Sequence, residues 1–464
     1  MLQIRNPSLA QPSLFRTYLS ERIGYRIASR GSVSTLLGLF CAALLLSGVA
    51  LARWRRLAHL AWVAPGLALV AAVPLVGLGL RSQRSVPVTV GEAQFVELSD
   101  SADQLTANGL LAFYDPQSTG EAMGARAGGR FELDSAIAAG STRRMVWSDV
   151  DCWQWENLRP STGLRTATFH WSGDLPQPLA VHGTFSAEGF TAHWTESAVS
   201  LADAVIAVPG QPYLSVQRDG PRLAAGPKDV LAPGRYVSDG WLSDEQRRRQ
   251  AVLEQMLAPR AGYVRQILRP TLFGWGDAVE MGFQFPRHEQ RVGTALWAIP
   301  LNIDRPPAGT PVVIPSPFVQ FRIATRPTGE GASPLYDYRN GVWVASQKPS
   351  EMWLQFQTPE AVLPLQLQRA RLTLQITAPS RKLEILRYVG TRKQLLHQVS
   401  NPIGRIERTF QDAELPPLDA DGRLLLGIIV GPAIEAGHGP ERKPWKIELA
   451  QLEIAGVVLP EARE

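Results

Sequence analysis

Two long apolar segments near the N-terminus constrain this chain more than any other feature. Residues 33–52 (VSTLLGLFCAALLLSGVALA) and 57–80 (LAHLAWVAPGLALVAAVPLVGLGL) contain no Asp, Glu, Lys or Arg. A helix rises 1.5 Å per residue, so about 20 residues cross a hydrocarbon core of about 30 Å. Only four residues separate the two segments. We therefore expect a transmembrane helical hairpin over residues 33–85, the alternative being a buried helical pair in a soluble core.

The first apolar segment is expected to stay as an anchor rather than to be removed as a signal peptide. Ala50-Leu51-Ala52 imitates the small-residue pattern of a cleavage site, but 32 residues precede the apolar run and a second run follows at once. Within residues 1–32, the stretch 14–29 mixes apolar side chains with Arg and suits an amphipathic juxtamembrane helix. That helix either lies at the lipid surface or packs on the protein itself.

The positive charge of the chain is concentrated at its start. Residues 1–90 hold ten Arg and one acidic residue, whereas the remaining 374 residues hold 37 Lys and Arg against 41 Asp and Glu. A protein that binds nucleic acid needs a basic face on its folded domain to displace counterions from phosphates. No such face is evident after residue 90, so nucleic acid is excluded as a partner and the lipid bilayer is expected as one.

Charge alone leaves the direction of the hairpin open. Arg53, Arg55 and Arg56 lie in the loop, and five Arg flank the outer ends of the two segments. The positive-inside rule counts all of these charges, so the total narrowly favours both ends in the cytoplasm. The higher density of positive charge in the loop instead favours the loop in the cytoplasm.

From residue 86 onward the pattern changes to short alternating segments separated by turn residues. Residues 165–171 (RTATFHW), 179–185 (LAVHGTF) and 189–194 (GFTAHW) show the alternation of half-buried antiparallel strands. We predict a mainly β chain with an immunoglobulin-like sandwich over 86–240 and a helical linker over 241–267, in which Ser243 and Gln246 form a capping box. A jelly-roll sandwich over 268–464 should follow, with 424–430 as a central strand.

Parts of the sequence resemble known proteins. The tract RIASRGSVSTLLGLF…ARWRRLAHLAWVAPGLALV resembles the paired spans of uncharacterised bacterial membrane-anchored envelope proteins, and VHGTFSAEGFTAHW…LADAVIAV resembles the immunoglobulin-like module after those spans. The tail (WLQFQ…RARLTLQI…DGRLLLGIIV…WKIELAQLEIAG) is similar to galactose-binding-like jelly rolls. The resemblance implies an anchor in the bacterial cytoplasmic (inner) membrane, with the loop inside and the large C-terminal region extracytoplasmic. Such proteins often carry a further domain before the first span, where this chain has 32 residues, so that domain's function is not transferred.

The short motifs of common active sites are missing from the sequence. It contains no GxSxG, GxxxxGK[ST] or HExxH pattern, and His288-Glu289 begins a zincin-like word in which Val292 replaces the second His. We therefore expect a non-enzymatic protein with no cofactor. An unrecognised hydrolase stays as a weaker alternative, because active sites are defined by geometry rather than by sequence order.

Three histidines on neighbouring predicted strands form a candidate metal site. His170, His182 and His193 each lie on a different strand, and neutral imidazoles suit zinc. The strand register is not known from sequence, and the alternative is that these histidines are ordinary strand residues that bind no metal. The segment 419–422 (DADG) resembles the start of a calcium loop, but a turn before the next strand explains the same residues.

The segment 147–156 (WSDVDCWQWE) has the most unusual composition in the chain. Its candidate ligand-binding residues are Trp147, Asp149, Asp151, Trp153 and Trp155. Indole faces stack on sugar rings, and carboxylates accept hydrogen bonds from sugar hydroxyl groups. Side chains two residues apart on a strand share one face. The alternative, which we favour, is that these rings fill the sandwich core.

These observations support two main functional hypotheses. The first is a membrane-anchored envelope protein whose sandwiches bind other envelope or membrane proteins. The second is a glycan-binding envelope protein that uses the jelly roll or the Trp-rich segment.

Overall fold

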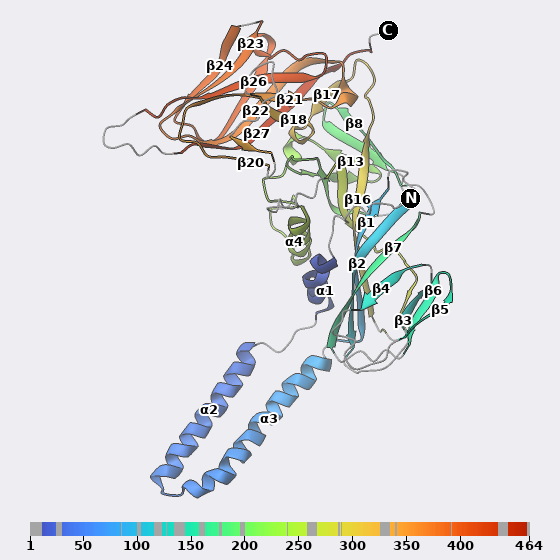
Figure 1. The fold of residues 1–464 in the computed structure, drawn as a ribbon, viewed down its shortest axis with the longest axis vertical. Coiled ribbons are helices and arrows are strands. Elements are labelled where there is room, and N and C mark those ends of the chain that lie inside the picture. Colours follow the sequence, from blue (N-terminus) through green and yellow to red (C-terminus); the bar gives the residue numbers. More distant parts are fainter. Residues whose placement is uncertain are drawn as a thin grey trace. The chain divides into compact units, whose positions relative to one another are not determined.

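The computed structural model shows a mainly β chain in which helices α1 to α3 precede the strands (Figure 1). It describes residues 12–24, 30–84, 86–99, 104–115, 123–126, 128–133, 144–156, 163–175, 179–194, 200–238, 240–257, 267–285, 288, 290–324, 335–338, 341–390, 392–434 and 444–461. These residues pack as two compact units. Unit 1 comprises residues 1–96, 106–173 and 277–295, and unit 2 comprises 97–105, 174–276 and 296–464.

The two apolar segments form the helices α2 (Arg30–Arg53) and α3 (Leu60–Arg84), joined by a turn and the 3-10 helix η2 (Leu57–His59). The helices lie side by side in Figure 1 and run in opposite directions. Each contains a window of at least 18 residues that is long and apolar enough to span a membrane, and neither window is buried. Exposed Leu and Val side chains therefore cover the hairpin, as expected for helices that face lipid.

The amphipathic segment before the hairpin folds as a 3-10 turn, η1 (Pro12–Leu14), and the helix α1 (Phe15–Ile23). Its apolar face is buried, and a methyl group placed on Gly91 would lie 3.0 Å from Ile23 and 3.3 Å from Leu19. The helix thus packs on the protein itself, which is the second of the two expected alternatives. Residues 25–29 of the predicted helix lie outside the described residues.

The β part of unit 1 contains two groups of paired strands. Strands β1, β2, β7 and β4 pair in that order, and a second sheet has the order β15-β3-β6-β5. Their bounds are β1 Thr89–Leu98, β2 Gln104–Asp115, β3 Met123–Arg126, β4 Arg130–Leu133, β5 Arg144–Asp149, β6 Cys152–Glu156, β7 Gly163–Asp174 and β15 Phe283–Gln284. Their buried aromatic rings form the core, with Phe131 in contact with Phe283 and Trp153 at centroid distances of 5.6 and 4.9 Å.

The first part of unit 2 is built from short antiparallel strands and one helix. Its elements are β8 Val181–Ser186, β9 Gly189–Trp194, β10 Ala202–Ala207, β11 Leu214–Ser215, β12 Gln217–Asp219, β13 Arg222–Ala225, η4 Pro227–Asp229, α4 Asp244–Leu257 and β14 Thr271–Gly276. Strand β9 begins and ends where the sequence predicts. The register β12-β13-β9-β8 runs antiparallel, and β14 pairs with β10.

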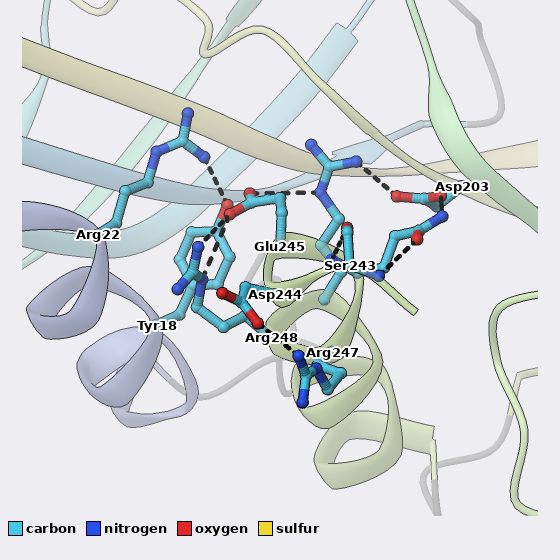
Figure 2. Close-up of polar contacts among 10 residues, drawn as sticks. Tyr18, Arg22, Asp203, Ser243, Asp244, Glu245, Arg247 and Arg248 are labelled. Carbon is cyan, nitrogen blue, oxygen red and sulfur yellow. Dashed lines mark hydrogen bonds and ion pairs between the residues drawn. The ribbon is translucent and has the colours of Figure 1, made fainter. Parts of the chain in front are cut away.

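Helix α4 begins at the predicted capping box. The backbone N–H of Gln246 donates to Ser243 Oγ at 3.2 Å, and the backbone N–H of Ser243 donates to Gln246 Oε1 at 3.0 Å. The arginine run on this helix is paired with acids, Arg247 with Asp244 and Arg248 with Glu245 (Figure 2). Arg249 likewise pairs with Asp203 of β10. These charges therefore stabilise the helix and its attachment within unit 2.

The C-terminal part of unit 2 is a two-sheet antiparallel sandwich with sheet orders β17-β27-β22-β25 and β18-β21-β26-β23-β24. Its strands are β17 Pro311–Ile314, β18 Gln320–Ala324, β21 Ser350–Gln357, β22 Leu365–Thr377, β23 Lys382–Val389, β24 Arg392–Ser400, β25 Ile403–Gln411, β26 Arg423–Val430 and β27 Lys446–Val458. Short elements join them: η5 Ser316–Phe318, β19 Tyr336–Asp337, β20 Val342–Trp343, η6 Glu360–Val362 and η7 Asp412–Glu414. The predicted central strand is confirmed, because β26 lies between β21 and β23.

Residues 268–303, predicted as the first strands of the jelly roll, pair elsewhere. Strand β14 joins β10, β15 joins β3, and β16 (Gln290–Ile303) runs parallel to β8 at its C-terminal end. The two compact units are consequently discontinuous in sequence, and the contiguous limits at 240 and 268 stay a prediction. Strand β15 covers only Phe283–Gln284, and the backbone N–H and carbonyl of Val279 before it are bound by the Gln94 side chain instead of a neighbouring strand. The segment 419–422 is a turn, since the Asp419 carboxylate accepts the Arg423 N–H at 2.7 Å.

Candidate functional site

The Trp-rich segment lies on β5 and β6 of unit 1, at one side of the sheet β15-β3-β6-β5. Trp147 of β5 stands opposite Trp153 of β6, and Met145 stands opposite Trp155. Directly opposed residues and residues two apart share a face, so the three indoles lie on one face of the sheet. Their centroids form a chain, with Trp153 lying 6.3 Å from both Trp147 and Trp155.

The three indoles differ sharply in exposure. Trp153 is only 3% exposed, contacts Phe131 and donates its indole N–H to the carbonyl of Gly129 at 2.7 Å. Its environment is that of a core residue. Trp147 is 53% exposed, so its ring reaches solvent at the edge of the sheet. Trp155 is half-buried between these extremes. Trp147 is thus the indole of this segment best placed to meet a ligand.

The two candidate acids follow Trp147 closely in the chain, Asp149 at the end of β5 and Asp151 in the turn before β6. Asp149 Oδ1 accepts the Val150 N–H at 2.7 Å, and the Asp151 carbonyl accepts the Gly128 N–H at 3.2 Å. Both carboxylates and the side chain of Val150 are exposed. Both acids are therefore exposed and lie within four residues of Trp147 in the chain, and their use as a glycan site stays a prediction.

The three candidate histidines are spread over the two units. His182 and His193 are direct cross-strand partners on β8 and β9, and His182 Nδ1 lies 3.1 Å from Asp304 Oδ2. His170 belongs to unit 1, where its Nδ1 lies 2.6 Å from Asn108 Oδ1. Among the described residues no group of three His, Cys, Asp or Glu side chains is arranged to hold a metal ion.

A buried polar cluster on β1 was not singled out from the sequence. Glu92 is 1% exposed and accepts hydrogen bonds from the Gln94 amide at 2.6 Å and from Arg291 at 3.1 Å. Arg291 also pairs with the exposed Glu280. Burial raises the pKa of Glu92, and it outweighs the hydrogen bonds from Gln94 and Arg291 that lower it. Two polar residues at alternate positions of an apolar strand were the available signal.

The outer side of the five-stranded sheet carries a second aromatic cluster. Met352 and Leu354 point into the sandwich, so Trp353 between them points outward, where its indole lies over Gly427 of β26. The ring is 1% exposed, lies 4.5 Å from the Tyr388 ring, and donates its N–H to Glu351 at 3.0 Å. Lys393 binds the same carboxylate, and this hydrogen bond lowers the pKa of Glu351. The cluster is closed to a ligand in this arrangement.

Exposed apolar side chains gather instead on the hairpin β19–β20. We name Val342 and Val344, which share one face of the hairpin and are 46% and 43% exposed, the hairpin patch. The Tyr338 hydroxyl accepts the Ile323 N–H at 2.7 Å and donates to the Ile323 carbonyl at 3.1 Å. It thereby satisfies the open edge of β18 and fixes the hairpin against the sandwich. A fixed and partly apolar surface is suited to contact another protein.

The four-stranded face of the sandwich is different in character. Arg371 pairs with Glu407, which also pairs with Arg405 at 2.6 Å, and Arg369 pairs with Glu453 at 3.4 Å. The hydrogen bond from Arg371 lowers the pKa of Glu407. The charges of this face satisfy one another, so the face offers little unpaired charge to a partner.

Comparison with known proteins gives little further guidance. No family model matches the chain, and no curated protein matches it. Among solved structures, the chain is similar to the M60 catalytic domain with the CBM51-1 and CBM51-2 domains from Clostridium perfringens ZmpB, at 7% identity and a TM-score of 0.15. The similarity covers 76% of this chain and 34% of that one, so the chain spans about a third of that structure's length. A TM-score this low carries no argument about fold or ligand.

Proposed function

We propose that this chain is a non-enzymatic protein anchored in the bacterial inner membrane, whose β-rich units bind envelope proteins. The observation that carries the anchor is the contact between α1 and β1. Helix α1 precedes the first apolar helix and β1 follows the second, yet Leu19 and Ile23 pack at Gly91. Both ends of the hairpin must therefore lie on the same side of a membrane. An anchor of two spans satisfies this requirement, and a single span does not.

The proposed orientation places the turn of the hairpin in the cytoplasm and the β-rich units outside it. The three Arg of the turn support this orientation by their density. On the other side, Arg22 donates a hydrogen bond to the Tyr18 hydroxyl at 2.6 Å within α1, so its charge is part of a packed helix. That hydrogen bond leaves the charge in place, so the count of five flanking Arg against three still opposes this orientation, and the proposal follows the charge density and the resemblance.

Protease digestion of intact spheroplasts tests the orientation. A C-terminal tag on the full chain should be removed by external protease, because the units lie outside. Survival of the tag until lysis would place the units in the cytoplasm and overturn the proposal. The resemblance to envelope proteins would then no longer guide the search for partners.

The hairpin patch is the proposed contact for a protein partner. Its apolar side chains are exposed on a fixed hairpin, whereas the charges of the four-stranded face are paired among themselves. We expect a stoichiometric partner to co-purify on mild solubilisation and to be lost with Val342→Asp. Thr409→Asp, an exposed change on the charge-paired face, is the matched control and should retain it. Loss of the partner with both variants or with neither would reject the hairpin patch.

The exposure of Trp147 keeps glycan binding as a second candidate. A half-exposed indole followed closely in the chain by Asp149 and Asp151 is a reasonable site for sugar stacking and hydrogen bonding. We expect any binding of envelope polysaccharide to be lost with Trp147→Ala and kept with Trp241→Ala, since Trp241 is exposed elsewhere in the chain. Trp153 is unsuitable for this test because it supports the core. Equal binding by wild type and Trp147→Ala would remove this candidate.

A further inference from the structure

The turn between α2 and α3 concentrates positive charge where the chain supplies no negative charge. Arg53, Arg55 and Arg56 are exposed, and Trp54 between them is 70% exposed. No Asp or Glu occurs anywhere from residue 22 to residue 91. Helix α2 has 24 residues and is therefore about 36 Å long, which separates the turn from the start of the hairpin. Acidic side chains near that start are too far away to neutralise the turn.

The backbone of the turn is already hydrogen-bonded, so the arginine side chains are the groups that face outward. The N–H groups of Trp54, Arg55 and Arg56 donate to the carbonyls of residues 50, 52 and 51 at 3.1, 3.0 and 2.9 Å. Arg55 adopts a left-handed backbone with φ of 54°. This conformation closes the turn within a few residues, so the three arginines follow one another closely along the chain.

Phosphate is the anion whose geometry suits such a group. Guanidinium binds phosphate oxygens through two parallel hydrogen bonds, and Trp side chains favour the level of lipid headgroups. If the hairpin spans a membrane, its turn emerges at that level, with Trp54 and the exposed Trp62 at the boundary. We infer that Arg53, Arg55 and Arg56 form a binding site for the headgroup of an anionic phospholipid. This inference rests on the proposed membrane anchor.

Lipid selectivity of the reconstituted full-length protein tests the inference. The protein is placed in phosphatidylcholine vesicles that contain either spin-labelled phosphatidylcholine or spin-labelled phosphatidylglycerol, and the fraction of label immobilised by protein is measured. Each basic residue near a membrane surface contributes up to about fivefold in association. We expect the wild type to prefer phosphatidylglycerol by about fivefold or more, and added salt to weaken this preference.

Two triple variants locate the preference. Changing Arg53, Arg55 and Arg56 together to Gln should lower the preference several-fold, and the Arg that flank the outer ends of the hairpin keep the remainder. Arg247→Gln, Arg405→Gln and Arg423→Gln together remove the same net charge from exposed positions outside the hairpin and should retain it. Equal loss in both triple variants would show a response to net charge alone and would overturn the site.

The test separates this inference from the proposed anchor. A wild type that immobilises both labels equally is inserted without headgroup preference, which rejects the site and leaves the anchor intact. A wild type that immobilises neither label is not inserted, which rejects the anchor and the site together. Only a preference that depends on the arginines of the turn supports the inference.

Discussion

The β part of unit 1 and the C-terminal sandwich of unit 2 both hold a buried tryptophan, but their carboxylates lie in opposite environments. Unit 1 buries Glu92 within its strands, and burial raises the pKa of that group. The C-terminal sandwich keeps Glu351 and Glu407 near its surface, where hydrogen bonds from Lys393 and Arg371 lower their pKa values. The comparison teaches that similar β architectures should respond to acid with opposite signs, because desolvation dominates in one and pairing in the other.

The largest expected effect distinguishes the buried indole of Trp153 from the exposed indole of Trp147 in unit 1. Trp153→Ala removes a ring that packs on Phe131 and leaves the Gly129 carbonyl without its donor, so it should cost about 3–5 kcal/mol of unfolding free energy. Trp147→Ala should cost about 1 kcal/mol, since that ring is 53% exposed. Hydrogen exchange of peptides from β5 and β6 in detergent measures both. Similar losses for the two variants would contradict the assignment of Trp153 to the core.

The next effect concerns the indole of the C-terminal sandwich and the glycine beneath it. A methyl group on Gly427 would stand 2.8 Å from the Trp353 ring, so Gly427→Ala should destabilise β21 and β26 by about 1–3 kcal/mol. The cost should largely vanish when Trp353 is already Ala, because the obstruction is then gone. A double-mutant cycle measured by hydrogen exchange gives this coupling. Additive effects would show that Gly427 is not required by the ring.

A smaller effect is the acid response of unit 1. A carboxylate whose pKa is raised by folding binds its proton more tightly in the folded chain, so its contribution to stability is greatest below its ordinary pKa of 4.5 and falls as pH rises through the raised value. We expect the opening free energy of β1 to decrease as pH rises above about 4.5. Glu92→Gln should flatten this slope, since the amide does not titrate. Hydrogen exchange at several pH values, corrected for intrinsic rates, measures it.

The control for this titration is the other carboxylate that faces Arg291. Glu280 is exposed, so Glu280→Gln should leave the slope of β1 largely unchanged. A slope that persists in Glu92→Gln, or disappears in Glu280→Gln, would assign the titration to a different group. Below about pH 4.5 the C-terminal sandwich should show a slope of the opposite sign, losing stability as pH falls, because the pKa values of Glu351 and Glu407 are lowered from 4.5.

The sequence was informative where a local pattern decides the structure. The apolar runs that become α2 and α3, the capping box of α4, and strands β9 and β26 depend on nearby residues, and the structure confirms them. Strand pairing across long sequence separations was not accessible in this way. Nothing local in residues 271–303 indicates that β14 pairs with β10 or β15 with β3, so the sequence did not predict these pairings.

The candidate site shows the same limit at the scale of single residues. Alternation correctly places Trp153 and Trp155 on one face, but it does not tell which indole the opposite sheet covers. That distinction depends on Phe131 of β4, a buried ring from another sheet of the unit. The environment of Glu92 likewise depends on Arg291, about 200 residues away in the chain.

The smallest expected effect is that of the surface ion pair beside Trp353. Glu351 and Lys393 are each about 40% exposed, so solvent screens the pair, and exposed pairs contribute about 0.2–1 kcal/mol. Lys393→Met keeps the aliphatic stem near the indole and removes only the charge, so the unfolding free energy at neutral pH should fall by an amount within that range. The lowered pKa of Glu351 should move back toward its ordinary value, which carboxylate NMR measures. The matched control is Arg423→Met, which breaks the exposed ion pair between Arg423 of β26 and Asp421 in the preceding turn. It should leave the titration of Glu351 unchanged. A loss of several kcal/mol in Lys393→Met would instead mean that the ammonium group holds the Trp353 cluster closed. The carboxylates of the two units would then differ in the extent of their burial rather than in the kind of interaction that controls them.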